Sequence, residues 1–333
     1  MNLKNYLGFK EQAMHYLDRP HQEVANQAVD SPAAWRSSEL PPLEQVAYIL
    51  SSAEVSEIKQ AVAHAESLNK PTLELTRDDF PLPSLDEKFP LWRDTIHRGL
   101  GFQVIRGVPV DDWNKAQAEL FFWCFGLHLG TPGLQNPEGH LLGHVNDLGV
   151  QGEDPTARLY KTASHINFHC DAADVVGLLC LKKAKAGGHS RIASSVTVFN
   201  DLVSSHPHLA KKLFDKRFVD NRDKEVNSPD GAIEVQPCCY ADGTLRTFYH
   251  LDYFKSVPRH DAVEALTDED HALFEMYEKI ANDPKNCFDM SLEPGDIQLI
   301  SNHTTLHART EFEDDIDPDK RRHLLRLWLS IGL

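Results

Sequence analysis

The sequence predicts an α+β domain whose sheet is an antiparallel sandwich or barrel, and three observations support this prediction. Helical patterns come early in the chain, short β-type runs come later, and Pro-Gly turns separate those runs. Segregated runs of helix and strand are typical of α+β proteins, whereas a doubly wound sheet alternates them. Since no repeat or clear linker divides the chain, we expect residues 1–40 to form a polar, irregular arm that packs on the core through Trp35, and residues 41–333 to form a single domain.

The helical segments are predicted from apolar spacing and from capping residues. Apolar residues recur at spacings of three and four, which places them on one face of a helix. Gly130 ends the second predicted helix, and Thr267 with Asp270 forms a capping signal at the start of the last one. The predicted helices span residues 51–68, 111–130, 197–214 and 267–282.

Strands are predicted from short apolar runs bounded by turn residues. One of them, "RTFYHLDYF" (246–254), has many aromatic residues and is expected to be a core strand in which His250 and Asp252 are paired polar groups. The predicted strands span residues 101–110, 174–184, 246–254, 296–302 and 322–331.

Composition limits the classes of function that this chain can have. It has 333 residues, 41% of them hydrophobic, and a formal net charge of −16 with no basic block, which disfavours nucleic acid as a partner. No apolar run is long enough to span a membrane. The six cysteines show no Cys-x-x-Cys spacing and the N-terminus has no signal-like apolar run. We therefore expect a cytoplasmic protein with free thiols that acts on a small molecule, either as a monomer or as a homo-oligomer.

A histidine and a carboxylate two residues apart can bind one metal ion, but this spacing is common in a chain rich in both. With 18 histidines and 50 acidic residues in 333, chance predicts about 18 × 50/333, or roughly 2.7 pairs. Four occur, and they begin at His21, His64, His169 and His250. His64 lies in a predicted helix, where i and i+2 point to different sides, and His21 lies in the polar arm. His169 and His250 border predicted strands, where i and i+2 share a face.

The segment "GDIQLISNHTTLHAR" (295–309) offers a third ligand for the His169 pair. It follows a Pro-Gly turn with a predicted strand, and His307 at the end can complete a facial triad with His169 and Asp171. Two imidazoles and one carboxylate on one face of an ion leave open positions opposite, as in non-haem Fe(II) oxygenases. A zinc hydrolase would accept the same three ligands, and so would a metal-binding protein without catalytic activity.

Two arginines near the C-terminus indicate a carboxylate-bearing cosubstrate. In "RRHLLRLWL" (321–329), strand alternation places Arg322, Leu324 and Arg326 on one face. An inward face with two guanidinium groups requires an anion, and a carboxylate fits the guanidinium fork. The alternative is an edge strand whose arginines reach solvent.

Together these pieces resemble the taurine dioxygenase/clavaminate synthase-like (TauD/TfdA) family of iron(II)- and 2-oxoglutarate-dependent dioxygenases. The resemblance extends from about residue 35 to the end, and the motifs occur in the family's order. They are "GFQVIRGVP", "FHCDAADVVGLLCL", "GGHSRIASS", "GDIQLISNHTTLHAR" and "RRHLLRLWL". The resemblance implies a double-stranded β-helix, or jelly-roll, core of mostly antiparallel strands flanked by helices.

The resemblance also implies the cofactors and the residues that bind them. His169, Asp171 and His307 would bind Fe(II), and 2-oxoglutarate and O2 would be the cosubstrates. His303 stands where relatives often have an arginine and is a rival third ligand, but His307 occupies the family's ligand position.

Three further positions match residues that bind anions in relatives. Arg322 would hold the distal carboxylate of 2-oxoglutarate. Ser190 stands where many relatives have a threonine that helps to bind this carboxylate, and His189 replaces a frequent aspartate. Arg326 matches an arginine that contacts an anionic substrate group in some relatives.

The expected reaction is oxidation of an unactivated C–H bond by hydroxylation, desaturation or cyclisation, with release of succinate and CO2. The substrate would be a small metabolite of secondary metabolism, such as an amino acid or another carboxylate. Segments 135–149 and 157–168 precede the ligands and are expected to form a substrate lid. The predicted substrate contacts in them are Gln135, Asn136, Tyr160 and Asn167.

Overall fold

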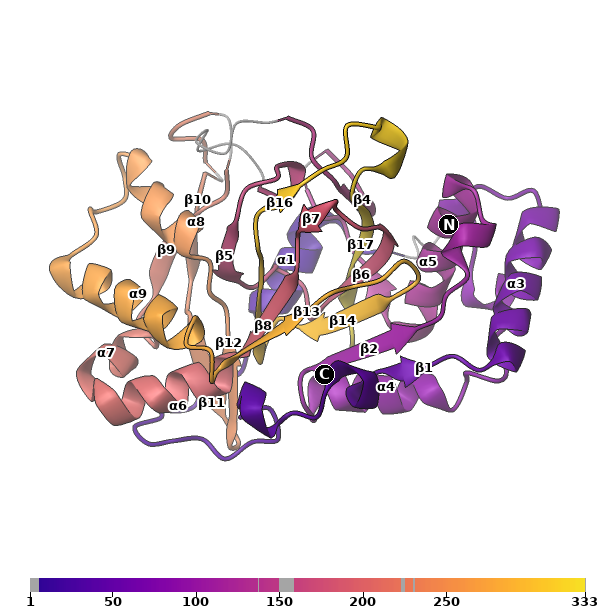
Figure 1. Ribbon diagram of the computed structural model, residues 1–333. Helices are drawn as coiled ribbons and strands as arrows, with labels where there is room; N and C mark the ends of the chain where they lie inside the picture. Colours follow the sequence, from indigo (N-terminus) through magenta and orange to yellow (C-terminus); the bar gives the residue numbers. More distant parts are fainter. Residues whose placement is uncertain (1–5, 137, 150–158, 223–224, 230, 333) are drawn as a thin grey trace.

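Two antiparallel β-sheets form the core of the molecule, and helices cover both of them (Figure 1). The computed structural model describes residues 6–136, 138–149, 159–222, 225–229 and 231–332. The larger sheet has the order β1-β2-β14-β6-β17-β3, and β4 joins it by pairing with β17. All its pairs are antiparallel except β1 with β2. Its strands are β1 (Tyr48–Ile49), β2 (Phe102–Arg106), β3 (Thr131–Pro132), β4 (Leu142–Val145), β6 (Val175–Lys182), β14 (Ile297–Ser301) and β17 (His323–Ser330).

The smaller sheet has the order β13-β8-β15-β5, with every pair antiparallel. Its strands are β5 (Ile166–His169), β8 (Ser190–Ser194), β13 (Cys287–Met290) and β15 (Thr305–Arg309). Apolar side chains from both sheets form one buried cluster that includes Phe102, Val176, Ile192, Ile300 and Trp328. The two sheets therefore pack against each other over a shared core.

Three two-stranded ribbons lie outside these sheets. They are β7 (Ala186–Gly187) with β16 (Phe312–Glu313), β9 (Arg217–Asp220) with β10 (Ala232–Val235), and β11 (Cys238–Ala241) with β12 (Thr244–Thr247).

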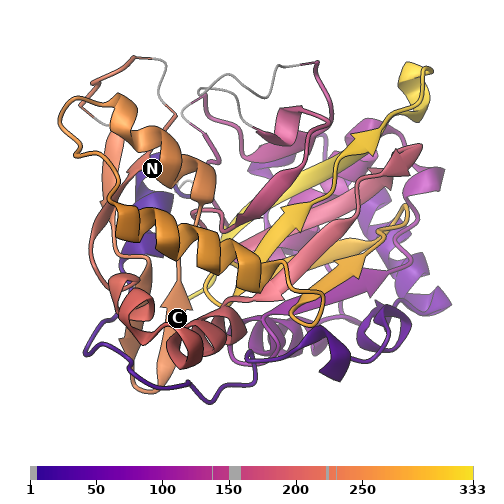
Figure 2. The same cartoon turned by 60° about the vertical axis from the view of Figure 1, so that its left-hand side comes forward.

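Helices form two groups, one for each sheet (Figures 1 and 2). Helices α4 and α5 pack on the larger sheet and α3 packs on α5, while α6 packs on the smaller sheet with α7 and α9 beside it. The α-helices are α1 (Phe9–Leu17), α2 (Leu43–Val46), α3 (Ser52–Ser67), α4 (Lys88–His97), α5 (Lys115–Leu129), α6 (Ser195–Ser205), α7 (Pro207–Lys212), α8 (Leu251–Ser256) and α9 (Asp268–Ala281). The 3-10 helices are η1 (Ser37–Glu39), η2 (Thr72–Glu74), η3 (Arg77–Asp79), η4 (Val110–Asp112), η5 (Leu159–Lys161), η6 (Val257–Arg259) and η7 (Pro318–Lys320).

The α+β prediction is confirmed, and most of the predicted elements are found. Helix α3 begins after its cap Ser51, and α9 begins after Thr267, whose side chain accepts a hydrogen bond from the backbone N–H of Asp270. The helix predicted over 197–214 is divided into α6 and α7 at Pro207, because proline cannot donate the backbone hydrogen bond that a continuous helix needs.

The strand predicted over 246–254 is wrong beyond Thr247. Helix α8 follows there, with Leu251 and Phe254 buried at helical spacing and Asp252 between them partly exposed. The aromatic residues of this segment suit a strand, but the spacing of its buried residues is helical. His250, expected within a strand, instead precedes the helix.

The N-terminal arm is more ordered than the sequence predicted. Trp35 is buried as expected and donates from Nε1 to the carbonyl oxygen of Leu100 at 2.8 Å. Residues 9–17, however, form helix α1, in which only Gln12 and Tyr16 are buried. With so few apolar residues on the buried face, the helical pattern is weak in the sequence.

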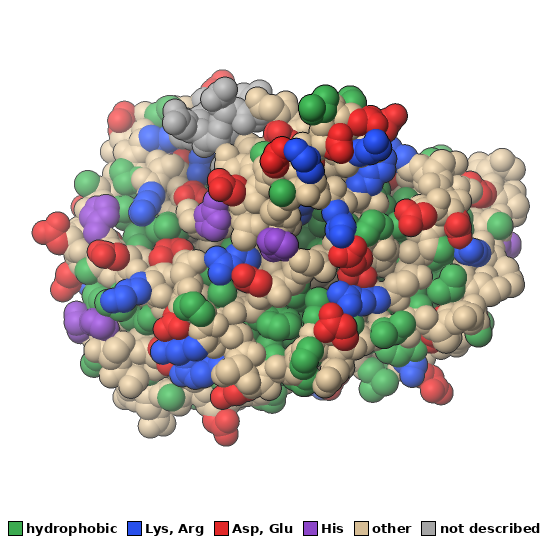
Figure 3. Space-filling model, viewed as in Figure 1, with side chains coloured by type: hydrophobic (Ala, Val, Ile, Leu, Met, Phe, Trp, Pro, Cys, Tyr) green, Lys and Arg blue, Asp and Glu red, His purple; other side chains and the backbone are tan. Residues whose placement is uncertain are grey.

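The surface agrees with the composition. Acidic and basic side chains are interspersed over the face drawn in Figure 3. Among the described residues, no helix is both long and apolar enough to cross a membrane. All six cysteines are free and buried.

Candidate active site

His169, Asp171 and His307 come together at one edge of the smaller sheet, where edge strand β5 pairs with β15. Strands β5 and β15 pair antiparallel in a register that places His307 opposite His169. The ring centroids of these histidines are 4.1 Å apart. One potential ligand atom from each of the three residues lies within 4.8 Å of the others. The predicted triad is thus assembled by strand pairing, and Asp171 follows the end of β5.

The two imidazoles are oriented as metal ligands require. Nδ1 of His169 lies 2.9 Å from the carbonyl oxygen of Asn167, so a proton on Nδ1 leaves the Nε2 lone pair free. Nε2 of His307 lies 3.7 Å from Oδ2 of Asp171. Burial and the neighbouring His169 lower the pKa of His307 to about 3. His307 is therefore neutral at physiological pH, which is the form that binds metals.

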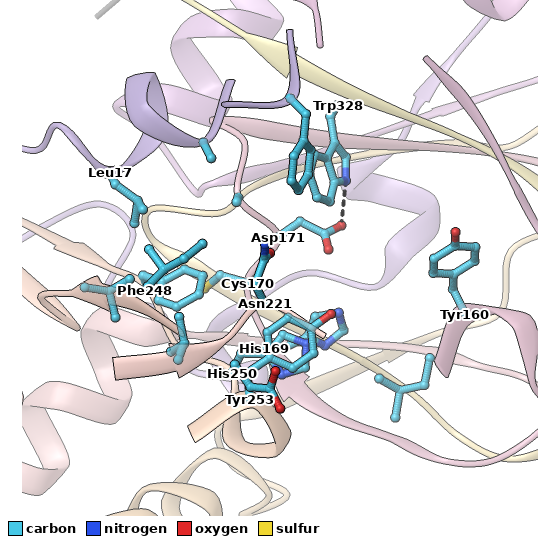
Figure 4. Close-up of a pocket in the computed structure, with 18 of the residues that line it drawn as sticks. Leu17, Tyr160, His169, Cys170, Asp171, Asn221, Phe248, His250, Tyr253 and Trp328 are labelled. Atoms are coloured by element: carbon cyan, nitrogen blue, oxygen red, sulfur yellow. Dashed lines mark hydrogen bonds between the residues drawn. The ribbon is translucent and has the colours of Figure 1, made fainter. Parts of the chain in front are cut away.

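Asp171 is held by three groups from other strands and loops. Its Oδ2 accepts a hydrogen bond from Nε1 of Trp328 at 2.9 Å (Figure 4) and lies 3.4 Å from Nη1 of Arg326. Its backbone N–H donates to Oδ1 of Asn302 at 2.9 Å. Burial raises the pKa of Asp171, but Arg326, His307 and His169 together outweigh burial and lower it. The carboxylate is therefore ionised, as a metal ligand must be.

His303, the rival third ligand, points elsewhere. Its Nε2 lies 2.9 Å from Oδ1 of Asp174, and its ring stacks on Tyr16. Asp174 also binds Nε2 of His15 at 2.9 Å. The structure thus places His307, rather than His303, beside His169 and Asp171.

A small cavity of about 60 Å³ adjoins the triad on one side, and we call it the arginine cavity. Arg309, Arg322 and Arg326 all line it, together with Ser190. Nη1 of Arg322 is buried and has no hydrogen-bond partner among the described residues. Burial lowers the pKa of Arg322 to about 10, so the guanidinium stays charged at neutral pH. A buried cation in this state requires an anionic ligand.

Arg309 is a second buried cation of this cavity, and the sequence interpretation gave it no role. Its Nη2 donates to the carbonyl oxygens of Thr162 and Ser164, while Nε and Nη1 have no partner among the described residues. Burial and the charge of Arg322 lower the pKa of Arg309 to about 9. The signal was present, because strand alternation places position 309 on the same face as His307.

Ser190 lies in the arginine cavity as the sequence predicted. It is on β8, which pairs with β15 so that Ser190 is opposite Arg309. Its hydroxyl group donates to Oε1 of Gln298 at 2.9 Å. Strand alternation also holds in the C-terminal segment, because Arg322, Leu324 and Arg326 all line this cavity.

A larger cavity of about 130 Å³ adjoins the triad on another side, and we call it the apolar cavity. Figure 4 shows Leu17 and Phe248 on one side of Asp171 and Tyr160 on the other. His250, whose ring stacks on Tyr253 with centroids 3.6 Å apart, lies next to His169. The other apolar residues of the lining are Phe9, Ala13, Ile166, Ala172, Val219, Ile233, Val235 and Trp328.

Of the five predicted substrate contacts, Tyr160 and Arg326 line both cavities, whereas Gln135, Asn136 and Asn167 line neither. Gln135 is buried, and its Oε1 accepts a hydrogen bond from Nε of Arg326 at 2.8 Å. Asn136 bonds to His140, and Asn167 donates to Asp252 at 3.2 Å. The structure gives these three side chains protein partners.

The two segments predicted to form a substrate lid also differ from that prediction in the structure. Within residues 135–149, β4 is a strand of the larger sheet, paired with β17, rather than a mobile cover. Within residues 157–168, positions 157 and 158 lie outside the described residues. The remainder contains η5 with Tyr160, followed by β5.

Comparison with known proteins identifies the family. Residues 67–328 match the model of the family described as "Taurine catabolism dioxygenase TauD, TfdA family". The chain belongs to the TauD/TfdA family. It is therefore an iron(II)- and 2-oxoglutarate-dependent dioxygenase, and this membership sets aside the zinc hydrolase and the non-catalytic binding protein.

Two curated relatives cover nearly the whole chain. FR-33289 synthase of Streptomyces rubellomurinus is 29% identical over 312 residues, which are 93% of this chain and 92% of the relative. The taurine hydroxylase-like protein SAT17 of Stachybotrys chartarum is 26% identical over 322 residues, 93% of this chain and 82% of the relative.

Solved structures confirm the jelly-roll fold of this TauD/TfdA chain. An asparagine oxygenase in complex with Fe(II), 2S,3S-3-hydroxyasparagine and succinate superposes with a TM-score of 0.67 at 17% identity, covering 86% of this chain and 93% of the other. The non-haem iron oxygenase OrfP in complex with Fe and α-ketoglutaric acid gives a TM-score of 0.64 at 18% identity, covering 86% and 94%.

The residues of this chain fit the cofactors of its family. The triad supplies two imidazoles and a carboxylate, a donor set that suits Fe(II). The arginine cavity beside it offers buried guanidinium nitrogens with no protein partner among the described residues, as a dicarboxylate such as 2-oxoglutarate requires.

Trp328 is a further residue that the sequence interpretation missed. Its side chain donates to Asp171 and lines the apolar cavity. The alternation that places Arg322 and Arg326 on the inward face reaches Trp328 two residues later. Extending that pattern would have found it.

Proposed function

We propose that this enzyme oxidises an unactivated C–H bond of a small metabolite that carries a carboxylate, by hydroxylation, desaturation or cyclisation. The observation that supports this most is the position of the triad between two cavities of different character. One is lined by buried arginines and the other by apolar side chains. Such a site can hold a dicarboxylate cosubstrate and a separate organic substrate at the same metal.

When bound, Fe(II) and 2-oxoglutarate supply O2-dependent oxidation of a C–H bond, with release of succinate and CO2. His169, Asp171 and His307 would hold the metal. Trp328 and Asn302 form hydrogen bonds with Asp171 and would orient it as a metal ligand.

Arg322 and Ser190 would bind the distal carboxylate of 2-oxoglutarate. The guanidinium group of Arg322 is buried and needs an anion, and the Ser190 hydroxyl group lies in the same cavity. The apolar residues around them, such as Leu292 and Leu324, exclude water and so strengthen this ion pair.

Arg326 would contact the anionic group of the substrate. It lines both cavities, and its guanidinium group lies 4.5 Å from the ring centroid of Tyr160. The hydrogen bond from its Nε to Gln135 fixes its orientation. A substrate carboxylate at Arg326 would lie within reach of the metal, because Arg326 is 3.4 Å from Asp171.

A cytoplasmic location agrees with the cysteines of this chain. All six are free and buried, which suits a reducing compartment. No disulfide is present among the described residues.

The test is an anaerobic titration of the metal-free protein with Fe(II) and then with 2-oxoglutarate. The iron chelate of 2-oxoglutarate has a visible charge-transfer band, which we expect for the natural sequence and not for His169→Ala. Succinate release is then measured in air over a panel of amino acids and other carboxylates.

A band together with succinate release that a carboxylate from the panel stimulates would support the proposal. A band with stimulation only by substrates that lack a carboxylate would contradict the role of Arg326. Absence of the band in the natural sequence, with tight binding of Zn²⁺ instead, would contradict the whole assignment.

A further inference from the structure

Segments outside the two core sheets form much of the wall of the apolar cavity. Helix α1 contributes Phe9, Ala13 and Leu17, and the β9–β10 ribbon contributes Val219, Ile233 and Val235. Figure 4 shows Leu17 beside Phe248, on the far side of the cavity from Tyr160. The polar residues Tyr160, His169, Asp171 and Arg326 belong to the metal side of the lining. The other polar residues of the lining are Asp220, Asn221, His250 and Tyr253.

Helix α1 presents one face to this cavity. Phe9, Ala13 and Leu17 are spaced by four residues, which aligns them along one side of the helix. All three are partly exposed, since the cavity lies beside them. Met14 lies on another face and is 62% exposed to solvent.

The adjacent face of α1 is fastened to the core. The hydroxyl group of Tyr16 donates to the carbonyl oxygens of Thr247 at 3.0 Å and Asn302 at 2.9 Å. Oε1 of Gln12 accepts a hydrogen bond from the hydroxyl group of Ser330 at 3.1 Å. These bonds fix α1 as a rigid wall rather than a loosely attached arm.

The charged residue that the β9–β10 ribbon adds to the lining is already neutralised. Asp220 accepts hydrogen bonds from Nε and Nη2 of Arg259 at 2.7 and 3.0 Å and from the backbone N–H of Arg222 at 2.8 Å. Its side chain is fully buried. Asp220 therefore supports the β9–β10 ribbon and does not offer a charge to a ligand.

We infer that α1 is the specificity-determining wall of the substrate site, and that the substrate is a carboxylate whose far end is an apolar chain or ring. This inference rests on the proposed function and names its substrate class. The carboxylate faces Arg326, and the apolar end lies along Phe9, Ala13 and Leu17. A substrate with a polar far end, such as free asparagine or arginine, would leave its donors and acceptors unpaired against this wall.

The expected binding pattern follows from apolar burial. Each methylene group buried in the cavity contributes about a fourfold gain in affinity. Affinity should therefore rise with chain length until the cavity is filled, and then level off.

The experiment measures binding to the anaerobic Fe(II)·2-oxoglutarate complex of the full chain by calorimetry. The probes are the linear carboxylates from butanoate to decanoate, with L-asparagine and L-arginine as polar comparisons. We expect octanoate to bind more tightly than butanoate and both amino acids.

Two variants of α1 change the size of the cavity in opposite directions. Ala13→Phe fills it and should weaken octanoate at least about tenfold, the loss of roughly two buried methylenes, while butanoate stays within about twofold. Leu17→Ala enlarges it and should move the best chain length to a longer acid. Met14→Ala is the matched control and should leave every affinity within about twofold.

Equal affinity along the series, or tighter binding of L-asparagine than of octanoate, would overturn the inference. So would unchanged chain-length preference in both Ala13→Phe and Leu17→Ala, and Leu17→Ala alone decides if Ala13→Phe does not fold. The charge-transfer band of the natural sequence distinguishes failure of the proposed function from failure of the inference about α1. Its absence contradicts the proposed function, whereas its presence with no chain-length preference contradicts only the inference.

Discussion

The arginine cavity and the apolar cavity share one metal site but differ in how the chain builds them. Strands of the core sheets carry the arginine cavity, with Ser190 on β8, Arg309 on β15 and Arg326 on β17. Peripheral segments carry much of the apolar cavity, namely α1, the β9–β10 ribbon and the start of α8.

This difference determines which residues can be changed without disturbing the core sheets. Positions on a paired strand are fixed by register, so a change there disturbs both neighbouring strands. A helix or ribbon laid against the core can change its inner face while the sheets stay intact. The residues of the arginine cavity therefore cannot change without disturbing the core sheets. The residues of the apolar cavity that lie on peripheral segments can change while the core sheets stay intact.

The strongest test of the comparison acts on the metal site that both cavities share. His307→Ala should weaken Fe(II) binding more than about a hundredfold, since even groups that only support a ligand contribute about 10- to 100-fold. Fe(II) affinity is measured anaerobically by competition with a chelator. His303→Ala is the control, because His303 binds Asp174 instead of the metal site, and the opposite ranking of the two variants would make His303 the ligand.

The next test acts on the arginine cavity alone. Arg322→Gln should raise the Kd of 2-oxoglutarate roughly 30-fold, because a hydrogen bond to a charged group contributes about 2 kcal/mol. The Kd is measured from the charge-transfer band. Arg321→Gln is a matched control, since Arg321 is exposed and donates to the carbonyl oxygen of Asp315. If Arg322→Gln alters only octanoate binding, the assignment of 2-oxoglutarate to the arginine cavity and of the substrate to the apolar cavity is wrong.

A third test concerns Asp220 in the wall of the apolar cavity and measures how its contribution to the free energy of unfolding depends on pH. Burial raises the pKa of Asp220, but Arg259 and the other hydrogen-bond donors outweigh it and lower the pKa to about 2, from 3.8. A carboxylate with a lowered pKa in the folded state stabilises the fold above its unfolded pKa and loses this effect as the pH falls toward 2. Asp220→Asn should therefore cost about 2 kcal/mol at pH 7, and this difference should shrink between pH 4 and pH 2.

Urea unfolding of the natural sequence and of Asp220→Asn at pH 7, 4 and 3 measures this difference. Asp94→Asn is the control, because Asp94 and Arg98 form an exposed pair with 62% and 76% of their side chains accessible. Such surface pairs contribute only about 0–1 kcal/mol. A difference for Asp220→Asn that does not change with pH would show that its pairing with Arg259 is not electrostatic.

The smallest effect is expected at Ser190. Its hydroxyl group already donates to Gln298, so it contributes about 1 kcal/mol to cosubstrate binding, and Ser190→Ala should raise the Kd of 2-oxoglutarate about fivefold. Ser190→Thr keeps the hydroxyl group and should bind as the natural sequence does. Unchanged affinity in Ser190→Ala would remove this residue from the site.

The sequence could indicate which residues lie together on the arginine side of the site, because they follow a local rule. His169 with Asp171, and Arg322 with Arg326, are separated by even numbers of residues near or along strands, and such residues share a face. The same rule also places Arg309 and Trp328 on these faces. They were missed because the rule was not extended to them.

The apolar side could not be predicted in this way. Phe9 and Val235 line one cavity although more than half of the chain separates them. Their contact depends on how peripheral segments settle on the core, and no spacing in the sequence encodes it. Helices α1 and α8 were missed for a different reason, because they are short and each buries only two residues.

Asn302 connects the metal ligand Asp171 with helix α1, which lines the apolar cavity. Its side chain accepts a hydrogen bond from the backbone N–H of Asp171, and its carbonyl oxygen accepts one from Tyr16 of α1. Helix α1 therefore has one face that natural variation can alter and one face that it must preserve. Substrate range can diversify through Phe9, Ala13 and Leu17, while a change at Tyr16 would be transmitted to a metal ligand. An engineer who wishes to redirect this enzyme should randomise the former positions and leave the latter untouched.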